Sequence, residues 1–283
     1  MFILDSTVCW SASDLAESAQ CEFAVLRKLD YCLGRAERPT AAADPLQEHI
    51  ARLGDAHEAQ ILNERRAAGS IVELGHVPRP LTRERLLAAR EATLAAFRAE
   101  PDVVYQPAFF DGEFFGYADF VERTESGWLV CDAKLARQAK PTAMLQLAAY
   151  ASQIAALGLP LAPEVSLLLG SGERADFPAA DILSLFGERR QRLRTLLAEH
   201  RAHHGPVVWG DDAILACGRC DECEHAATEA DDVLIVAGVR MGQRRRLREA
   251  GILTVADLAS AEPDRRPARM APATFDNLVL QAS

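Results

Sequence analysis

The stretch "GYADFVERTESGWLVCDAKLAR", residues 116–137, places two aspartates and a lysine in a run that otherwise has the composition of paired β-strands. Residues 114–121 and 128–135 are rich in aromatic and β-branched side chains. The turn-forming residues 124–127 separate them, and this pattern predicts a β-hairpin. Charged side chains in such strands need a physical reason, because strand pairs of this composition bury apolar residues.

The pairing of the two strands determines which polar side chains meet. If Glu125 and Ser126 form the loop, Asp119 lies opposite Asp132, and a slip of two residues places it opposite Lys134 instead. Side chains alternate along a strand, so Asp132 and Lys134 share a face in either register. Cross-strand neighbours lie about 5 Å apart, and two carboxylates that close repel unless a cation or proton lies between them. The pattern indicates either a cation site or a solvent-facing polar edge.

Length and composition set the class of protein. The chain has 283 residues with 49% hydrophobic content, which is enough for one large domain or for one domain with an appendage. No apolar run approaches the roughly 20 residues of a membrane span. The N-terminus "MFILDSTVCW" lacks the basic start and long apolar core of a signal peptide. We therefore expect a cytoplasmic protein that does not bind membranes.

The charge distribution is uneven. A net charge of −10 is unfavourable for nucleic-acid binding, because phosphate contacts need Lys and Arg. Five arginines nevertheless fall within nine positions, namely Arg240, Arg244, Arg245, Arg246 and Arg248. Such runs are usually solvated helix faces, but a local basic patch can outweigh an unfavourable total.

Helix-start and helix-stop signals predict a chain with helices before and after the hairpin. Ser11 with Asp14 resembles a capping box and predicts a helix over 12–32. The Asp44-Pro45 pair predicts a helix that ends near Ala68. The remaining expected elements are helices over 83–99, 141–157 and 182–203 and a buried strand over 164–170. Helices, then a mixed sheet, then helices indicate an α/β or α+β protein.

The helix that ends near Ala68 carries a histidine on its apolar side. Leu46, Ile50, Leu53, His57 and Ile61 recur at three- and four-residue spacing and so share one stripe. A histidine in this position is most often a hydrogen-bonded core residue, and the alternative is a ligand.

Taken in order, the polar residues resemble a known nuclease pattern. His57, Asp119, the triplet Asp132-Ala133-Lys134, Gln146 and Tyr150 resemble the motifs of the RecB-like branch of the PD-(D/E)XK nuclease superfamily. "DAKLARQAKP" followed by "LQLAAY" is similar to a bacterial group of RecB-like nucleases, and the similarity covers about residues 3–280. The resemblance implies an α/β fold with a restriction-endonuclease-like core, a mixed central sheet flanked by helices, and a helical C-terminal appendage.

The resemblance also implies a function and a role for each residue. The implied function is a metal-dependent deoxyribonuclease, acting as an exonuclease on single-stranded ends in DNA repair or recombination. Asp119, Asp132, the Ala133 carbonyl and His57 would hold Mg²⁺ or Mn²⁺. Lys134 would orient the attacking water or stabilise the developing charge. Gln146 and Tyr150 would hold the DNA backbone, and they share a helix face because they are four residues apart.

The cysteines form a second constellation. The sequence contains seven, and "ACGRCDECEH" places Cys217, Cys220 and Cys223 three residues apart, which fits a metal or cluster site better than a disulfide framework. The resemblance to nucleases with an iron–sulfur cluster implies that Cys21 is the fourth ligand of a [4Fe–4S] cluster. The competing interpretation is Zn²⁺ bound by the three cysteines with Cys21 or His225.

The C-terminal part resembles a DNA-binding unit. "VLIVAGVRMGQRRRLREAGILTVADLAS" is similar to a helix-hairpin-helix segment, and a second such half begins at "MAPATFDNLVLQAS" before the sequence ends. We therefore expect two domains, a nuclease domain with the cysteines over 1–226 and a DNA-binding segment over 227–283 in a fragment or short form. The predicted DNA contacts are Arg240, Arg244, Arg245 and Arg246.

A second class of function is compatible with the same sequence. It is a non-catalytic DNA- or protein-binding module stabilised by an iron–sulfur or zinc site. The intact set of His, Asp, Asp, Lys, Gln and Tyr favours the nuclease, because a degenerate site has no reason to keep all six residue types. An electron carrier is disfavoured, since it leaves Asp119, Asp132 and Lys134 without a role.

Overall fold

The computed structural model describes residues 1–39 and 44–283. Within this part the chain forms two compact units. The first, called the sheet unit here, comprises Met1–Ala19 and Tyr31–His203, and the second, called the helical unit, comprises Gln20–Asp30 and His204–Ser283. The boundary falls within helix α2, Glu22–Leu33. No helix in the described ranges is long and apolar enough to cross a membrane.

A six-stranded mixed sheet with helices packed on it organises the sheet unit. The strand order is β10-β9-β8-β7-β4-β3, with parallel pairs β8–β9 and β3–β4 and antiparallel pairs elsewhere. The strands are β3 (Ile71–Glu73), β4 (Val103–Tyr105), β7 (Phe120–Thr124), β8 (Gly127–Lys134), β9 (Glu164–Leu169) and β10 (Arg174–Pro178). With the helical C-terminal region, this confirms the expected α/β protein with a mixed sheet flanked by helices.

Two hairpins lie outside the main sheet. They are β1 (Phe2–Leu4) with β2 (Thr7–Cys9), and β5 (Ala108–Phe110) with β6 (Phe115–Tyr117). The predicted first strand over 114–121 is therefore wrong in one respect, because it divides between β6 and β7. The break falls at Ala118–Asp119, where the Asp119 carboxylate accepts a hydrogen bond from the Ala133 backbone N–H at 2.8 Å. The Asp119 side chain thus takes the place of a backbone carbonyl as the partner of the Ala133 N–H.

The register of the central hairpin confirms the pairing expected from a two-residue loop. Phe120 pairs with Cys131, and Thr124 pairs with Gly127 across the loop of Glu125 and Ser126. This register brings the residue before β7 level with Asp132. The fold therefore positions the two predicted acids side by side at the end of the paired region.

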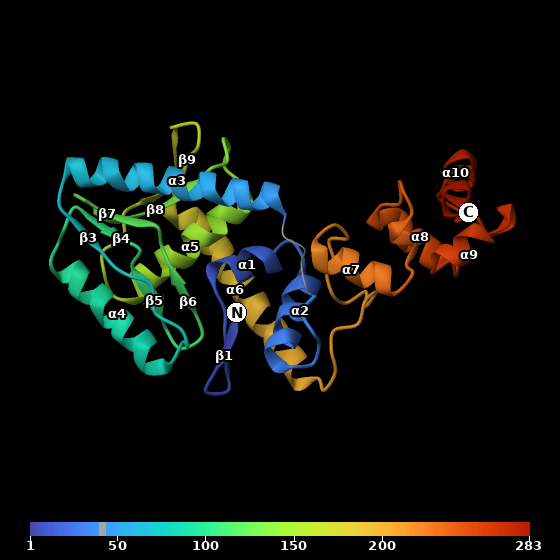
Figure 1. The fold of residues 1–283 in the computed structure, drawn as a ribbon, viewed down its shortest axis with the longest axis horizontal. Helices are drawn as coiled ribbons and strands as arrows, with labels where there is room; N and C mark the ends of the chain where they lie inside the picture. Colours follow the sequence, from blue (N-terminus) through green and yellow to red (C-terminus); the bar gives the residue numbers. More distant parts are fainter. Residues whose placement is uncertain (40–43) are drawn as a thin grey trace. The chain divides into compact units, whose positions relative to one another are not determined.

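Helix α3 (Pro45–Ala68) begins and ends as predicted. The Asp44 side chain accepts a hydrogen bond from the Leu46 backbone N–H at 2.9 Å, and Pro45 occupies the first helical position. In its C-terminal half, Ile61 and Leu62 pack on apolar side chains of the sheet, which include Phe120, Leu129 and Cys131. Figure 1 shows this half of α3 lying across the strands.

The N-terminal half of α3 has an exposed apolar stripe. Leu46, Ile50 and Leu53 are 64%, 50% and 44% exposed, whereas Ile61 is buried. The stripe seen in the sequence is therefore buried only at its C-terminal end. His57 lies between the two parts and is half-buried.

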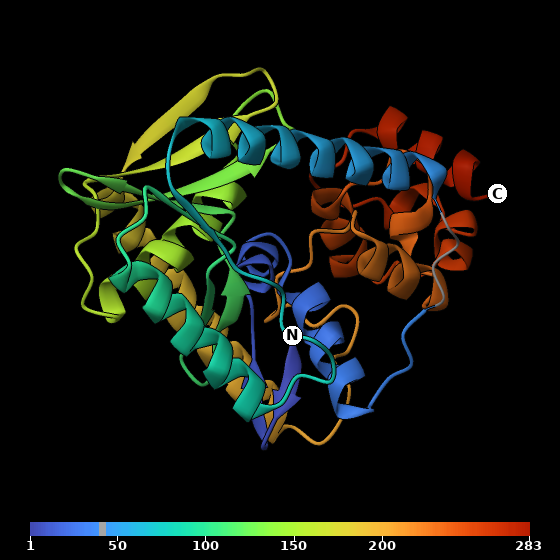
Figure 2. The same ribbon diagram turned by 60° about the vertical axis from the view of Figure 1, so that its left-hand side comes forward.

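Helices α5 (Pro141–Ala156) and α6 (Ala179–Ala202) pack together, and both contact the sheet. Leu129 and Cys131 face α3, so Val130 and Asp132 point to the opposite side of the same strand. Helix α5 contacts β8 and β9 there, and its fully buried Ala148 and Ala151 permit a close approach. Figure 2 gives a second view of these layers, with α4 (Arg83–Arg98) as the remaining long helix. The predicted bounds of these helices are confirmed within about three residues.

The predicted helix over 12–32 is two helices. Helix α1 (Ala12–Ser18) starts at the expected capping box of Ser11 and Asp14 and ends at Ala19. The chain then restarts as α2, and the Cys21 sulfur accepts a hydrogen bond from the Ala24 backbone N–H at 3.4 Å. Cys21 thus takes the position of an N-cap, which a continuous helix would not allow.

The helical unit has its own apolar core. It contains α7 (Asp221–Glu229), α8 (Met241–Glu249), α9 (Val255–Ala259), α10 (Pro272–Ala282) and the short 3₁₀ turns Val233–Ile235 and Pro263–Arg265. Leu247, Ile252, Leu258 and Phe275 are fully buried or nearly so within it. Gly251, with φ of 74°, makes the turn between α8 and α9, where a side chain would be strained. The helix–glycine–helix arrangement expected from the sequence is present.

Candidate functional site

Two carboxylates lie together at the end of the central hairpin. Asp132 is buried, with 4% of its surface exposed, and Asp119 is half-buried in the break between β6 and β7. Burial, together with the charge of Asp132, raises the pKa of Asp119 well above its usual value. Burial also raises the pKa of Asp132, although Lys134 opposes this. Two adjacent acids whose pKa values are both raised indicate a site with too little positive charge for both to ionise.

Lys134 supplies part of the missing charge. Its Nζ lies 2.6 Å from Asp132 Oδ2 as an ion pair. Burial alone would lower the pKa of Lys134, but the neighbouring Asp132 carboxylate outweighs it and raises that pKa. The lysine is therefore protonated at neutral pH. One ammonium group against two acids leaves the pair with unbalanced negative charge.

A third acid, which sequence reasoning missed, acts on the same site through its charge. Glu58 follows His57 on α3, and its carboxylate accepts hydrogen bonds from Tyr105 Oη at 2.8 Å and Gln106 Nε2 at 3.1 Å. Its charge contributes to the raised pKa of both Asp119 and Asp132. The signal that could have found it is its position directly after the histidine already singled out.

The backbone at Gln106 adopts an unusual conformation beside these acids. Its φ is 52°, in the left-handed region that residues other than glycine seldom occupy. The Gln106 N–H donates to the Asp119 backbone carbonyl at 2.9 Å while its side chain holds Glu58. The strained residue thus ties Glu58 to the segment that carries Asp119.

The predicted metal ligand His57 does not join the carboxylates in a compact ligand set. Its Nε2 lies 3.1 Å from the Leu168 carbonyl oxygen. Among residues 1–39 and 44–283, the four cysteines form the only group of three or more His, Cys, Asp or Glu residues whose ligand atoms all lie within 4.8 Å of one another. Ala133, whose carbonyl is the other predicted ligand, donates its backbone N–H to Asp119 at 2.8 Å.

Helix α5 brings Gln146 and Tyr150 toward the same region. Gln146 Nε2 donates to Ser13 Oγ at 3.3 Å, so α1 helps to fix its position. Tyr150 is buried, its ring packs against Phe109 and Phe114, and burial and the charges of the two aspartates raise its pKa. The catalytic set expected from the sequence (Asp119, Asp132, Lys134, Gln146 and Tyr150) therefore comes from neighbouring parts of one unit.

The carboxylate pair fits a hard divalent cation. Asp132 Oδ2 is buried with the Lys134 ammonium at 2.6 Å as its ion-pair partner, and the second carboxylate beside it calls for further positive charge or a proton. Carboxylate oxygens with water are the ligands that Mg²⁺ uses in proteins. Asp119 and Asp132 are thus suited to hold Mg²⁺ or Mn²⁺, with Glu58 as an additional negative charge nearby.

The four predicted cysteines come together in the helical unit. Cys21 Sγ lies 3.5 Å from Cys223 Sγ and 3.8 Å from Cys220 Sγ, and Cys217 Sγ lies 4.0 Å from Cys223 Sγ. His225 is not a member of the group and instead lies 3.4 Å from Glu229. The arrangement is that of a zinc or iron–sulfur site with Cys21, and not His225, as the fourth ligand.

The local fold favours a thiolate at Cys21. Cys21 precedes α2, and Cys220 is the N-cap residue of α7, so both lie where helix dipoles stabilise negative charge. Hydrogen bonds from the Cys220 and Cys223 thiols lower the pKa of Cys21 to about 4. Hydrogen bonds with Cys21 and Cys220, together with burial, raise the pKa of Cys223. Metal binding requires thiolates, so binding must displace the Cys223 proton.

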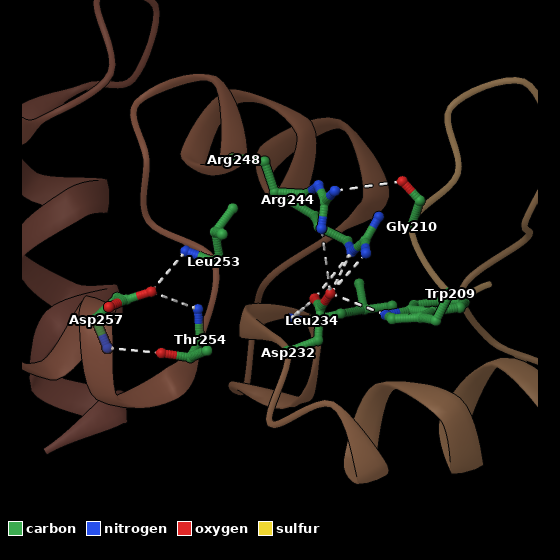
Figure 3. A network of polar contacts seen from close by, with 9 residues as sticks. All are labelled: Trp209, Gly210, Asp232, Leu234, Arg244, Arg248, Leu253, Thr254 and Asp257. Carbon is green, nitrogen blue, oxygen red and sulfur yellow. Dashed lines mark hydrogen bonds and ion pairs between the residues drawn. The ribbon is translucent and has the colours of Figure 1, made fainter.

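One of the predicted DNA-binding arginines is committed to an internal ion pair. Arg244 is 4% exposed, and its guanidinium donates to both carboxylate oxygens of Asp232 at 2.6–3.0 Å. Trp209 donates to the same carboxylate at 2.9 Å and packs its ring 4.6 Å from the Arg244 guanidinium carbon. Figure 3 shows this network, in which Arg248 donates to the Gly210 carbonyl at 3.2 Å. The Arg244 side chain is thus turned away from phosphate contact, which the prediction from sequence did not anticipate.

The other three predicted arginines differ from Arg244. Arg240, Arg245 and Arg246 are exposed, and Arg246 donates to the Arg269 carbonyl at 2.9 Å. Their side chains are accessible for contacts outside the unit.

A scan against models of known protein families finds no match to this chain, and a search of curated proteins also finds none.

Proposed function

We propose that the chain is a metal-dependent deoxyribonuclease of the RecB-like PD-(D/E)XK type, with a restriction-endonuclease-like core, that hydrolyses phosphodiester bonds at single-stranded DNA ends. The observation that carries the proposal is the pair of adjacent carboxylates, Asp119 and Asp132, with Lys134 at 2.6 Å from the second. A buried acid pair that one lysine only partly neutralises is costly to a fold and is expected where a cation is used.

The residues divide the chemistry between them. A divalent cation held by Asp119 and Asp132 would polarise the scissile phosphate and lower the pKa of the attacking water. Lys134 would donate from its ammonium group to that water or to the developing negative charge. Gln146, held in place by Ser13, would contact the DNA backbone, and Tyr150 would act beside it.

The four cysteines would hold a structural metal centre. The resemblance and the C-x₂-C-x₂-C spacing favour a [4Fe–4S] cluster. The sulfur separations favour one tetrahedral Zn²⁺, because metal–sulfur bonds of about 2.3 Å place thiolates about 3.8 Å apart. In a four-iron cluster each thiolate binds a different iron, so its ligands lie further apart than the four sulfurs here, of which three pairs are 3.5–4.0 Å apart and all lie within 4.8 Å of one another.

The helical unit would add DNA affinity through its exposed arginines. Arg240, Arg245 and Arg246 are suited to phosphate contacts, which dominate affinity for nucleic acids. Arg244 is assigned a structural role in this proposal, because Asp232 holds its guanidinium.

The test is cleavage of end-labelled single- and double-stranded DNA by anaerobically purified full-length protein with Mg²⁺ or Mn²⁺. Asp132→Asn should abolish cleavage, and Glu188→Gln, on the exposed side of α6, is the matched control that should retain it. DNA binding without cleavage in the wild-type protein would overturn the nuclease and support the non-catalytic binding module instead.

A further inference from the structure

A small pocket adjoins the candidate active site. It has a volume of about 160 Å³ and lies between the end of β8, the start of α5 and Leu167 of β9. Its polar lining residues are Lys134, Gln138, Lys140, Thr142 and Gln146. Lys134 and Gln146 are also members of the candidate active site, so the pocket opens from that site. We call it the lysine pocket.

The lysine content of the chain makes this pocket unusual. The sequence has 31 Lys and Arg residues, but only three are lysines, namely Lys28, Lys134 and Lys140. Two of these three line the lysine pocket. Lysine presents a compact charge with three donors on a flexible stem, whereas arginine presents a planar fork. Most basic residues of the chain are arginines, and the two lysines of this pocket are the basic side chains that fit a small space as compact cations.

The lining contains no acid, although the protein carries a net charge of −10. Two larger pockets differ in this respect: one includes Glu113 and the other includes Asp211, Asp212 and Glu249. The charge of Lys134 is offset by Asp132, but the chain positions no carboxylate in the lining opposite Lys140. The pocket therefore suits an anionic group.

The local sequence gives the pocket a fixed wall. The Gly170 N–H donates to the Ala136 carbonyl at 3.2 Å, and a Cβ at Gly170 would lie 2.2 Å from the Leu135 carbonyl oxygen. Only glycine lets the segment after β8 approach the end of β9 this closely. Pro141 then starts α5 directly after Lys140, and the helix dipole adds to the positive potential there.

We propose that the lysine pocket is a subsite for one phosphate group of the DNA backbone, next to the phosphate at Asp119 and Asp132, with Lys140 as its principal charged contact. Sites for whole small molecules have volumes of about 300–1,000 Å³, so 160 Å³ suits a single group. The inference rests on the proposed nuclease function and deepens it. Lys140 is a positioning residue in this arrangement, since it would hold the chain beside the phosphate that reacts.

Two sources could supply the phosphate: an internal phosphodiester or a terminal 5′-phosphate. The first arm of the test measures binding of 3′-fluorescein-labelled oligothymidylate, with and without a 5′-phosphate, to full-length protein without added divalent ions. Lys140→Ala is compared with Arg137→Ala, which removes an exposed positive charge from the same segment without altering the lining. Each phosphate contact on a single strand contributes about 0.7 to the slope of log Kobs against log salt.

The expected result is that Lys140→Ala lowers this slope by about 0.7 and Arg137→Ala leaves it unchanged. Equal losses for both oligonucleotides assign the contact to an internal phosphate, and a loss confined to the 5′-phosphorylated one assigns it to the end. Slopes of Lys140→Ala and Arg137→Ala that both equal the wild-type value would overturn the subsite, even if the protein binds and cleaves DNA.

The second arm does not depend on DNA or on cleavage. Pyridoxal 5′-phosphate with borohydride modifies accessible lysines, and peptide mass spectrometry separates the three sites. We expect inorganic pyrophosphate to protect Lys140 but not Lys28. Protection of Lys140 in a protein that neither binds nor cleaves DNA would support the anion pocket while the nuclease proposal fails. Absence of protection together with an unchanged slope would overturn the pocket alone.

Discussion

The Lys134 ammonium nitrogen lies 2.6 Å from Asp132 Oδ2, two residues earlier on the same strand. Alternation along β8 puts both side chains on one face, so the acid and its partial counter-charge are fixed by a single strand. Asp119 and Glu58 add further negative charge nearby. One lysine therefore balances the pair of carboxylates incompletely, and in the proposed nuclease a cation and Lys134 would have separate roles.

Lys134→Ala should remove cleavage and leave DNA binding nearly unchanged. The ammonium group would act in the transition state, where losing one such donor typically costs about 10²–10³-fold in kcat. In the absence of metal its charge is paired with Asp132, so it adds little to DNA affinity. Single-turnover cleavage and anisotropy measurements on the same preparation separate the two effects. Lys28→Ala is the control, and turnover by Lys134→Ala at the wild-type rate would show that the lysine is misassigned.

Asp119→Asn should stabilise the metal-free protein at neutral pH and abolish its stabilisation by Mn²⁺. A carboxyl whose pKa is raised on folding binds a proton more tightly in the folded state, so stability falls as the pH rises above the ordinary value of 3.8. The amide removes that charge but keeps an oxygen to accept from Ala133.

Differential scanning fluorimetry checks both halves of this prediction. At 100 times its Kd, Mn²⁺ should stabilise the wild-type protein by about 2.7 kcal/mol. Glu188→Gln should respond to Mn²⁺ as the wild type does. An equal Mn²⁺ response in Asp119→Asn would exclude this carboxylate as a ligand.

The local signals in the sequence were sufficient where a few neighbouring residues decide the structure. The turn at Glu125-Ser126 fixed the hairpin register, and Asp44-Pro45 fixed the start of α3. These local signals failed where a side chain takes the place of a backbone hydrogen-bond partner. Asp119 interrupts a strand by accepting from Ala133, and Cys21 caps α2 although no glycine or proline marks the break.

The residues of the candidate site could be predicted where their types and spacing follow a motif. They could not be predicted where a residue's role depends on tertiary packing. The four cysteines meet as expected. Glu58 looked like one more acid on a charged helix, and its role appears only when Tyr105 and Gln106 approach it. The burial of Arg244 depends on Asp232, twelve residues away, and no sequence period links the two.

Asp232→Asn should loosen the helical unit. The variant leaves Arg244 buried with its charge unpaired, which typically costs about 3–5 kcal/mol. Residues 231–283 of Asp232→Asn should exchange their amide hydrogens faster than those of Arg245→Gln, as read by mass spectrometry. Arg245→Gln is the control, because it changes an exposed arginine of α8, the helix that carries Arg244. Protection equal to the wild type would mean that the network in Figure 3 contributes little to stability.

The Asp232 carboxylate also predicts that the stability of the helical unit falls at acid pH. Burial alone would raise the pKa of Asp232, but hydrogen bonds from Arg244, Leu234 and Trp209 outweigh it and hold that pKa below the ordinary value of 3.8. A lowered pKa stabilises the folded state above 3.8, and the contribution is lost as the pH falls through the folded-state value. Exchange protection in the wild type should therefore fall below about pH 4, and Asp232→Asn should lack this step.

Cys21→Ser should destabilise the helical unit and release its metal together. Cys21 reaches Cys220 and Cys223 across about 200 residues of chain, and closing a loop of 100 residues already removes about 4.7 kcal/mol of unfolded-chain entropy in the polymer estimate. Cys32→Ser is the matched control, because Cys32 lies near the end of the helix that Cys21 caps but outside the cluster. Metal and acid-labile sulfide analysis of anaerobically purified protein identifies the centre. About four irons and four sulfides per chain indicate the cluster, and one zinc without sulfide indicates the tetrahedral site that the sulfur separations favour.

Chelation should lower the unfolding temperature of the wild type and the control but not of Cys21→Ser. Full metal occupancy in Cys21→Ser would exclude this residue as the fourth ligand.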